Sequence, residues 1–359
     1  TNGRTPSPSV RGNELMPQLV LSNHSRTLKL NKLISIGFQD NSNNIQLGSY
    51  RIYINDLNYY FNKIGIDSSI CGKDCDVEIY PKIGSFVPNK NKLIGIINPN
   101  SDDFYKLKNS DFAIVGSVEE KESILPYIKN IFVFPQIEKM YMNVNRKVHE
   151  DKDQIIIGYH GNPYHLNHMD LGLSKALERL SKVKNIKLLV IKSALSPISD
   201  WKIGKPNILI GYVDWNIKDI KQNIQNFDIG IVPNICQYKN GSFRDQNLQL
   251  GVHGTDVQIR FKNKSNIGRS LVLIQNGIPV VTDITPSNMS LFFNPDNGYS
   301  VLTEEGWYRA MLELCDPIRR NEVSQNAYDE YERQYDPLKW SSILYNQIYN
   351  LFVKKFSDI

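Results

Sequence analysis

Short apolar runs alternate with amphipathic stretches through most of this chain, and that alternation constrains its fold more than any other feature. Runs such as residues 93–97 and 112–115 have the length and the Ile and Val content of buried strands. Between such runs, residues 51–64 carry apolar side chains at helical spacing, and Gly65 follows as a helix stop. Strands that alternate with helices predict an α/β fold built on parallel sheets.

The alternation forms two series, which agrees with a length of 359 residues that exceeds one ordinary core. Polar, weakly periodic residues 135–152 separate the two series. We therefore expect two Rossmann-like domains that face each other across a cleft, over residues 31–145 and 150–337. The amphipathic residues from about 338 to 359 follow the breaker Asp336-Pro337, and we expect them to return to the first domain.

Residues 1–30 form a basic extension that we expect to pack poorly, because they are rich in Pro, Ser, Asn and Gly. Residues 1–32 hold five cations against one anion, which is +4 of the formal net charge of +5. A solvated tail is the simplest interpretation. Contact with anionic lipid is the alternative, so a peripheral contact with the inner membrane stays open. We expect no nucleic-acid partner.

Composition excludes several classes of protein. With 41% hydrophobic and 22% charged residues, the chain can bury a core and is not disordered overall. No stretch approaches the ~18 uncharged apolar residues of a membrane-spanning helix. Four cysteines are too few for a disulfide scaffold, so we expect reduced thiols and a cytoplasmic protein, or one at the cytoplasmic face of the membrane. His165 and His168 could share a helical face as metal ligands, but no third ligand accompanies them, and we expect no metal site.

Two segments of the second series suit an anion. The turn Gly158-Tyr-His160-Gly161-Asn162 follows the first strand, where glycine lets backbone N–H groups approach a phosphate; a simple tight turn is the alternative. The second segment is a cluster of four cations, Arg260, Lys262, Lys264 and Arg269, before an apolar helix. Ser265 or Asn266 can cap that helix, and Gly268 keeps its first turn open. A diphosphate would relieve the repulsion among these cations, and a solvated basic loop is the alternative.

The second segment also carries a resemblance to a known family. Residues 262–281, Lys-Asn-Lys-Ser-Asn-Ile-Gly-Arg-Ser-Leu-Val-Leu-Ile-Gln-Asn-Gly-Ile-Pro-Val-Val, resemble the donor-site segment of GT-B glycosyltransferases. Asn297-Gly298-Tyr299 is similar to their NG-aliphatic turn, and Asp316 to Arg320 is similar to their D-P-x-x-R stretch. Residues 208–213, 227–233 and 327–335 match further pieces in the same order. The first half of the chain resembles the family in layout only.

The chain departs from the large retaining family 4 of this group at two places. Two glutamates usually flank the helix start in that family, whereas Lys264 and Val272 stand there in this sequence. A histidine of the family's first domain also has no counterpart, since His24 in the tail is the sole histidine before the boundary region. The resemblance therefore indicates a divergent, group 1 or family 4-like member that lacks the two-glutamate motif.

The resemblance implies a metal-independent glycosyltransferase of the hexosyltransferase type, without a cofactor, because the nucleotide-sugar is its donor substrate. It would move the sugar to a glycan or lipid-linked glycan acceptor in bacterial surface polysaccharide synthesis. The alternatives are a catalytically inactive nucleotide- or glycan-binding protein and a nucleotide-sugar epimerase on the same fold. The donor residues that we expect are Gly161, Asn162, Tyr212, Val213, Lys262, Lys264, Ser265, Asn266, Gly268 and Arg269.

Four residues are the candidates for catalysis. Lys264 and Arg269 would stabilise the departing phosphate, and His160 lies at the turn beside it. Asp40, in the first loop of the first domain, is where an inverting enzyme could place a general base, although a loop aspartate that satisfies local N–H groups is the alternative. On the acceptor side, Gly48, Ser49 and Arg51 open the first helix, where they would contact the acceptor or cap the helix.

Overall fold

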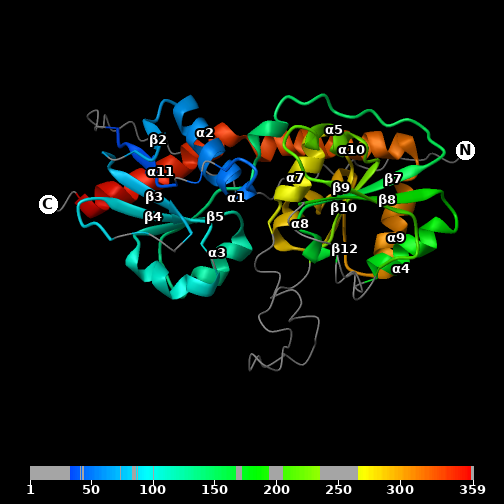
Figure 1. The fold of residues 1–359 in the computed structure, drawn as a ribbon, viewed down its shortest axis with the longest axis horizontal. Helices are drawn as coiled ribbons and strands as arrows, with labels where there is room; N and C mark the ends of the chain where they lie inside the picture. The colour runs from blue at the N-terminus through cyan, green and yellow to red at the C-terminus, as the bar shows by residue number, and fades with distance from the viewer. Residues whose placement is uncertain are drawn as a thin grey trace, which may run out of the picture. The chain divides into compact units, whose positions relative to one another are not determined.

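The computed structural model describes residues 33–40, 42, 44–72, 74–82, 86, 88–99, 101–166, 172–193, 205–234 and 266–356. The elements described below lie within Ile34–Ile359, which forms one compact unit. Two separate six-stranded parallel sheets organise it (Figure 1). The α/β architecture with parallel sheets that the sequence predicted is therefore confirmed.

The first sheet has the strand order β2-β1-β3-β4-β5-β6. Its strands are β1 (Ile36–Phe38), β2 (Ser68–Ile70), β3 (Val77–Pro81), β4 (Leu93–Ile97), β5 (Phe112–Val115) and β6 (Ile131–Val133). Ile114 packs into a core with α2 (Leu57–Lys63), while its neighbours Ala113 and Val115 pack into a core with α3 (Val118–Ile124). Both faces of the sheet are thus covered, which explains why every residue of β4 and β5 is buried.

The second sheet has the order β12-β11-β10-β7-β8-β9. Its strands are β7 (Ile155–His160), β8 (Ile186–Lys192), β9 (Ile210–Asp214), β10 (Ile229–Val232), β11 (Val280–Asp283) and β12 (Tyr299–Val301). One face packs on α4 (Leu173–Ser181) and α9 (Glu304–Glu313). The other face packs on α5 (Ile220–Gln225), α7 (Gly268–Gln275) and α10 (Pro317–Gln334). The second predicted series of strands is confirmed.

The last described helix, α11 (Pro337–Phe356), packs on the first sheet (Figure 1). Leu344, Tyr345 and Ile348 join the buried cluster that contains α2. The hydroxyl of Tyr345 accepts a hydrogen bond from the backbone N–H of Ile34 at 3.3 Å, and Lys355 pairs with Asp111 at 2.8 Å. α11 therefore supplies apolar and polar contacts to strands that lie more than 200 residues earlier in the sequence. The bounds of the two domains themselves remain a prediction.

The D-P-x-x-R stretch has a clear structural role. The side chain of Asp316 caps α10 by accepting from the N–H of Ile318 at 2.9 Å. Arg320, which is 1% exposed, donates from Nη1 to the carbonyls of Leu314 and Cys315, both at 2.9 Å. A guanidinium at the carboxyl end of α9 satisfies carbonyls that have no intrahelical partner and complements the helix dipole.

Other helix termini follow the sequence closely. Ser117 and Glu120 have the Ser-x-x-Glu spacing of a capping box, and Ser117 caps α3 by accepting from the N–H of Glu120 at 3.1 Å. Gly65 adopts φ +80° after α2, as expected of a helix stop. The first helix is irregular: a π-helical turn, η1 (Arg51–Asp56), joins α1 (Gly48–Tyr50) to α2. Within the described residues, no helix is long and apolar enough to cross a membrane.

Candidate functional site

The carboxyl ends of β7 and β10 and the start of α7 meet at one edge of the second sheet. β7 ends in His160, and Gly161 follows with φ +130°, a conformation that favours glycine. A Cβ on Gly161 would lie 3.0 Å from Cδ of Arg269 in α7. The turn and the helix start that the sequence proposed as two parts of one anion site therefore lie side by side. Such an edge is where ligands bind in parallel α/β sheets.

Arg269 is held across this edge by three hydrogen bonds. Its Nη1 donates to the hydroxyl of Tyr159 at 3.2 Å, and its Nη2 donates to the carbonyl of Pro233 at 3.0 Å and to Oδ1 of Asn234 at 2.5 Å. Each of these partners is neutral. Among the described residues, no carboxylate forms an ion pair with Arg269, so none of them compensates its positive charge at the start of α7. That is the electrostatic environment that an anion requires.

The partners of Arg269 are themselves fixed, and sequence analysis missed them. Tyr159 is fully buried and donates to the carbonyl of Asn162 at 2.5 Å. Asn234 is 2% exposed, and its backbone N–H donates to Oδ2 of Asp283 at 2.6 Å. The carboxylate of Asp283 thus bonds to the backbone of Asn234, and no ion pair joins it to Arg269. The signal for Asn234 was its place directly after the Pro233 that ends a predicted strand.

His160 positions α7. Its Nε2 lies 3.1 Å from the backbone carbonyl of Arg269, and because a carbonyl only accepts, Nε2 carries the proton. Burial, with a smaller contribution from the Arg269 charge, lowers the pKa of His160 to about 4. Burial likewise lowers the pKa of His165 well below 6.5. Both imidazoles are neutral at pH 7, and His160 contacts the backbone of the helix that carries Arg269.

Of the basic segment before α7, the structure describes only the part from Asn266 onward. Arg260, Lys262, Lys264 and Ser265 lie outside the described residues. Asn266 is described, and its Oδ1 accepts from the N–H of Gly268, the first residue of α7, at 3.1 Å. The N-cap position itself is Ile267, which makes no side-chain cap, so Asn266 lies one residue before the position that the sequence predicted for it. A Cβ on Gly268 would lie 2.9 Å from Oε1 of Gln136, so glycine permits a close approach there.

The two other predicted donor residues, Tyr212 and Val213, belong to β9, an outer strand of the second sheet. Two strands, β7 and β8, separate β9 from β10 in the sheet order. Tyr212 is 44% exposed, whereas Val213 is partly buried against the core beside α5 and α7. These two residues therefore lie on a different strand from those that hold Arg269.

A cavity of about 150 Å³ lies at the carboxyl edge of the first sheet. Asp40 and Ser49, both predicted site residues, line it together with Tyr50, Lys82 and Asn98. Asp40 follows β1, and its Oδ1 accepts from the N–H of Ser42 at 2.7 Å, which is the local interaction named above as its alternative role. Burial, and to a smaller extent the negative charge of Asp40, raises the pKa of Tyr50, so the Tyr50 hydroxyl stays protonated.

Lys82 and Asn98 were not singled out from the sequence, yet both have a positive φ, which is uncommon in residues other than glycine. Their φ angles are +62° and +52°, directly after β3 and β4. Each is held by a backbone hydrogen bond to the adjacent strand, from Lys82 N–H to the Ile97 carbonyl at 3.0 Å and from Asn98 N–H to the Ile114 carbonyl at 2.9 Å. Such conformations occur at functional sites more often than elsewhere.

Arg51 does not line this cavity. Its guanidinium pairs with Glu138 at 2.8 Å, donates to the carbonyl of Ile45 at 2.9 Å, and lies 4.9 Å from the ring centre of Trp215. It thus links the first helical region to the segment between the sheets and to the residue after β9. Gly48 lies close to it, since a Cβ there would be 3.9 Å from Nη2 of Arg51. In the described residues, no group of three or more acidic, His or Cys side chains could hold a metal ion.

Comparison with known proteins gives a structural likeness without a sequence match. No protein-family model matches the chain, and no curated protein sequence matches it. A point mutant of S. aureus TarM, solved in complex with Fondaparinux, alpha-GlcNAc-glycerol and UDP, is similar with a TM-score of 0.54 and 16% identity. That match covers 82% of this chain and 58% of TarM, so the chain spans less than two thirds of the length of TarM.

Two further structures match over nearly their whole length. Sucrose-phosphate synthase from Thermosynechococcus elongatus has a TM-score of 0.54 and 10% identity, covering 89% of this chain and 100% of that one. A glycosyltransferase from Rickettsia africae ESF-5 has a TM-score of 0.52 and 12% identity, covering 88% and 99%. Identities this low show the fold alone. Two parallel-sheet Rossmann-like bodies and these structural neighbours show that the chain has the GT-B fold, as its sequence predicted.

Proposed function

We propose that this protein is a glycosyltransferase that moves a sugar from a nucleotide-activated donor to a glycan or lipid-linked glycan acceptor. The observation that carries the proposal is Arg269, a cation without a carboxylate partner among the described residues, at the start of α7 and the carboxyl edge of the second sheet. The fold is that of known glycosyltransferases, and TarM has been solved with UDP. We propose that it acts in the cytoplasm, in the synthesis of a bacterial surface polysaccharide.

In this proposal, Arg269 and the backbone N–H groups of the first turn of α7 bind the diphosphate of the donor. Negative charge on the phosphate grows as the glycosidic bond breaks, so a fixed cation stabilises the transition state more than the ground state. Neutral partners suit this role, because they orient the guanidinium without cancelling its charge. Lys262 and Lys264 would add to the same field from the preceding segment. The reaction would then need no metal ion.

The acceptor would bind in the cavity beside Asp40. The second carboxylate oxygen of Asp40, Oδ2, could take the proton of an attacking hydroxyl, while Ser49 and the protonated Tyr50 would hold the acceptor in place. Lys82 would favour an acceptor that carries a negative group. His160, neutral and bonded to the Arg269 carbonyl, would fix α7 and take no proton in the reaction.

The test is a two-stage assay on the full chain. First, thermal shifts with UDP-, GDP-, dTDP- and CMP-sugars identify the donor. Second, donor consumption and product formation are followed by chromatography with and without EDTA. We expect one nucleotide class to stabilise the protein, and donor turnover that EDTA leaves unchanged. Donor binding without turnover would indicate a binding protein instead, and isomerisation of the donor without an acceptor would indicate an epimerase. Loss of activity in EDTA that Mg²⁺ restores would contradict the metal-independent mechanism.

A further inference from the structure

Gln136 follows the last strand of the first sheet, β6, yet its side chain lies against the first turn of α7, which packs on the second sheet. A Cβ on Gly268, the first residue of α7, would lie 2.9 Å from Oε1 and 3.0 Å from Cβ of Gln136. A side chain at position 268 would therefore displace Gln136. The amide of Gln136 thus lies beside the helix turn that carries Arg269, the cation on which the proposed function rests.

This amide can present either of its two ends to α7. Its Nε2 donates to the hydroxyl oxygen of Tyr53 at 2.6 Å, whereas its Oε1 has no hydrogen-bond partner among the described residues. Gln136 is half-buried, and Oε1 is not one of the enclosed polar atoms in the described part of the chain, so solvent reaches it. A tyrosine hydroxyl both donates and accepts, so turning the amide over keeps the bond to Tyr53 and brings Nε2 to α7. Burial raises the pKa of Tyr53, so its hydroxyl keeps the proton that the turned amide would accept.

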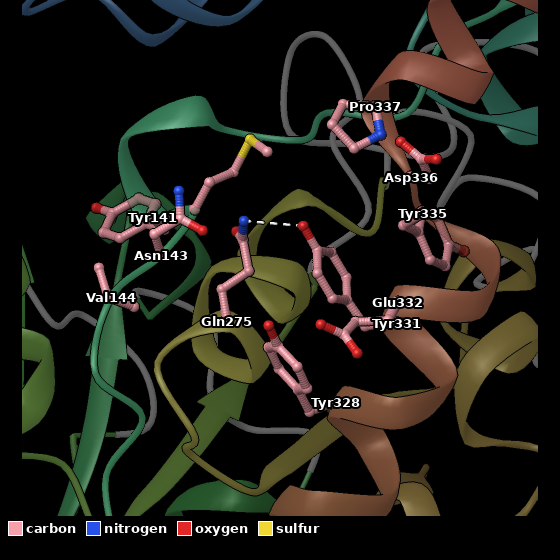
Figure 2. A pocket seen from close by; sticks show the side chains of 11 residues that line it. Tyr141, Asn143, Val144, Gln275, Tyr328, Tyr331, Glu332, Tyr335, Asp336 and Pro337 are labelled. Atoms are coloured by element: carbon pink, nitrogen blue, oxygen red, sulfur yellow. Dashed lines mark hydrogen bonds between the residues drawn. The ribbon is translucent and has the colours of Figure 1, made fainter.

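The segment that carries Gln136 is also fixed at the other end of α7. Ile137 is fully buried in the core beside α7, and the carbonyl of Glu138 accepts from Nε2 of Gln275, the last residue of α7, at 3.4 Å. Gln275 also donates to the hydroxyl oxygen of Tyr331 at 3.0 Å, beside a cavity of about 280 Å³ that both residues line (Figure 2). The segment is therefore held along α7, which fixes the backbone of Gln136 at the helix start.

A diphosphate at the first turn of α7 would select one orientation of the amide. Phosphate oxygens only accept hydrogen bonds, so they would exclude Oε1 and bind Nε2. A hydrogen bond to an ionised phosphate is shorter and stronger than one between neutral groups. A cation at the same place would prefer Oε1, but Arg269 and the positive end of the helix dipole would repel it. The charges around the amide therefore favour an anion that accepts from Nε2.

We propose that Gln136 is a ligand of the donor diphosphate, contributed to the donor site by the segment that follows the first sheet. This rests on the proposed function, which places the diphosphate at the first turn of α7. Nε2 would donate to a phosphate oxygen, while the hydroxyl of Tyr53 would donate to Oε1 and hold the amide in that orientation. The donor would then bind with full affinity only where the segment after β6 lies against α7.

Inorganic pyrophosphate is the probe, because it offers a diphosphate without a sugar or a base. Phosphorus NMR titration of the full chain in metal-free buffer measures its affinity. Gln136→Leu should weaken binding about tenfold, the effect of one lost hydrogen bond. Gln136→Glu should weaken it about a hundredfold, because a carboxylate adds repulsion to the lost bond. Glutamate keeps the length of the side chain and an oxygen for the Tyr53 hydroxyl, so a merely structural role would leave this variant close to wild type.

Gln275→Leu is the matched control, because it releases the same segment from the other end of α7 without touching the first turn. It should bind pyrophosphate as the wild type does. Tyr53→Phe should weaken binding less than Gln136→Leu, since the amide is still present but is no longer oriented. Melting temperatures check that each variant is folded.

Three outcomes would overturn the proposal, and they separate it from the proposed function. Equal affinities of wild type, Gln136→Leu and Gln136→Glu, together with a loss in Arg269→Ala, would exclude Gln136 and leave the donor site itself intact. An equal loss in Gln275→Leu and Gln136→Leu would show that docking of the segment matters and that the amide does not. Pyrophosphate binding that is absent, or that Arg269→Ala leaves unchanged, would contradict the donor site and with it the role of Gln136.

Discussion

His160 and Arg269 are joined by a hydrogen bond from Nε2 of the imidazole to the backbone carbonyl of the arginine, at 3.1 Å. The end of β7 therefore fixes the first turn of α7, while the side chain of the same arginine bonds to Tyr159, one residue before His160. Strand and helix are tied through both the backbone and the side chain of Arg269. The guanidinium is thus held in place before any ligand arrives, which is a requirement for electrostatic catalysis.

Arg269→Ala should lower kcat by about 10²-fold and raise KM less, because the interaction grows in the transition state. Arg269→Lys should recover part of kcat, since it keeps the charge but loses the bonds to Pro233 and Asn234. Steady-state rates against donor concentration measure both. Arg309→Ala, an exposed arginine of α9 that pairs with Glu305, is the matched control and should behave as wild type. A rise in KM at constant kcat would show that Arg269 binds substrate and transition state equally.

Arg320→Met should destabilise the fold by about 3 kcal/mol, because three backbone carbonyls lose a buried charged donor. Urea unfolding measures the change. The adjacent Arg319 bonds to exposed acidic side chains, and Arg319→Met should cost less than about 1 kcal/mol. Similar losses for the two variants would mean that the end of α9 does not depend on Arg320.

Asp56→Asn should stabilise the protein at neutral pH. Asp56 is 3% exposed, and burial raises its pKa from 3.8 to about 6 although it accepts from the N–H of Lys139 at 3.0 Å. A raised carboxyl pKa contributes stability below pH 3.8 that is lost as the pH rises through 6. The free energy of unfolding of the variant should exceed that of the wild type by at most about 3 kcal/mol at pH 7, and the two should be equal near pH 3.5. Urea titrations at the two pH values give this difference directly.

Acidification should weaken the fold, because burial lowers the pKa of both His149 and His160 from 6.5 to about 4. Each contributes stability above pH 6.5 that is lost as the pH falls toward 4. Protonation of Asp56 stabilises the fold as the pH falls over the same range, so it offsets part of this loss. We expect the free energy of unfolding to be about 2–3 kcal/mol lower near pH 5 than near pH 7.5. His149→Gln, which can still donate to the Gly277 carbonyl, should flatten the profile; an unchanged profile would show that His149 is not responsible.

Sequence patterns predicted the parts of this protein that depend on local periodicity. Apolar runs located the long strands, Ser117 and Gly65 marked helix ends, and the Asn266–Gly268 start of α7 was placed within two residues. The short outer strands β2 and β12 were not predicted, because their residues, Ser-Ser-Ile and Tyr-Ser-Val, form no apolar run and their pairing depends on neighbours that are distant in sequence. The contacts across the edge of the second sheet were not predicted for the same reason, because they join residues that are distant in sequence. Tyr159, Asn234 and Arg269 are far apart along the chain, and parallel strand order alone brings them together.

Charge patterns did not predict the hydrogen-bond and ion-pair partners of individual residues. Arg51 was expected to contact an acceptor or to cap its helix, and nothing in the sequence indicated that it pairs with Glu138 and lies against Trp215, which are far along the chain. Lys82 and Asn98 have no sequence signal, since a positive φ at a residue other than glycine is imposed by the surrounding fold. The cavity lined by Gln275 and Tyr331 could not be predicted from the sequence either, because packing between helices explains the presence of tyrosines such as Tyr331 equally well.

The contacts of α11 have a consequence for the order in which this protein is made. The first sheet ends at Val133, but its buried cluster includes Ile348, which the ribosome adds 215 residues later. At roughly 5–20 residues per second, the first sheet waits about 10–40 s for its last helix. During that interval the apolar surface of α2 that α11 will cover stays open to solvent or to chaperones. Among the described residues, the fully buried members of the second sheet's core all precede α11, which adds only the partly buried Trp340. That core can therefore largely form first, so the half that is synthesised later would finish folding earlier.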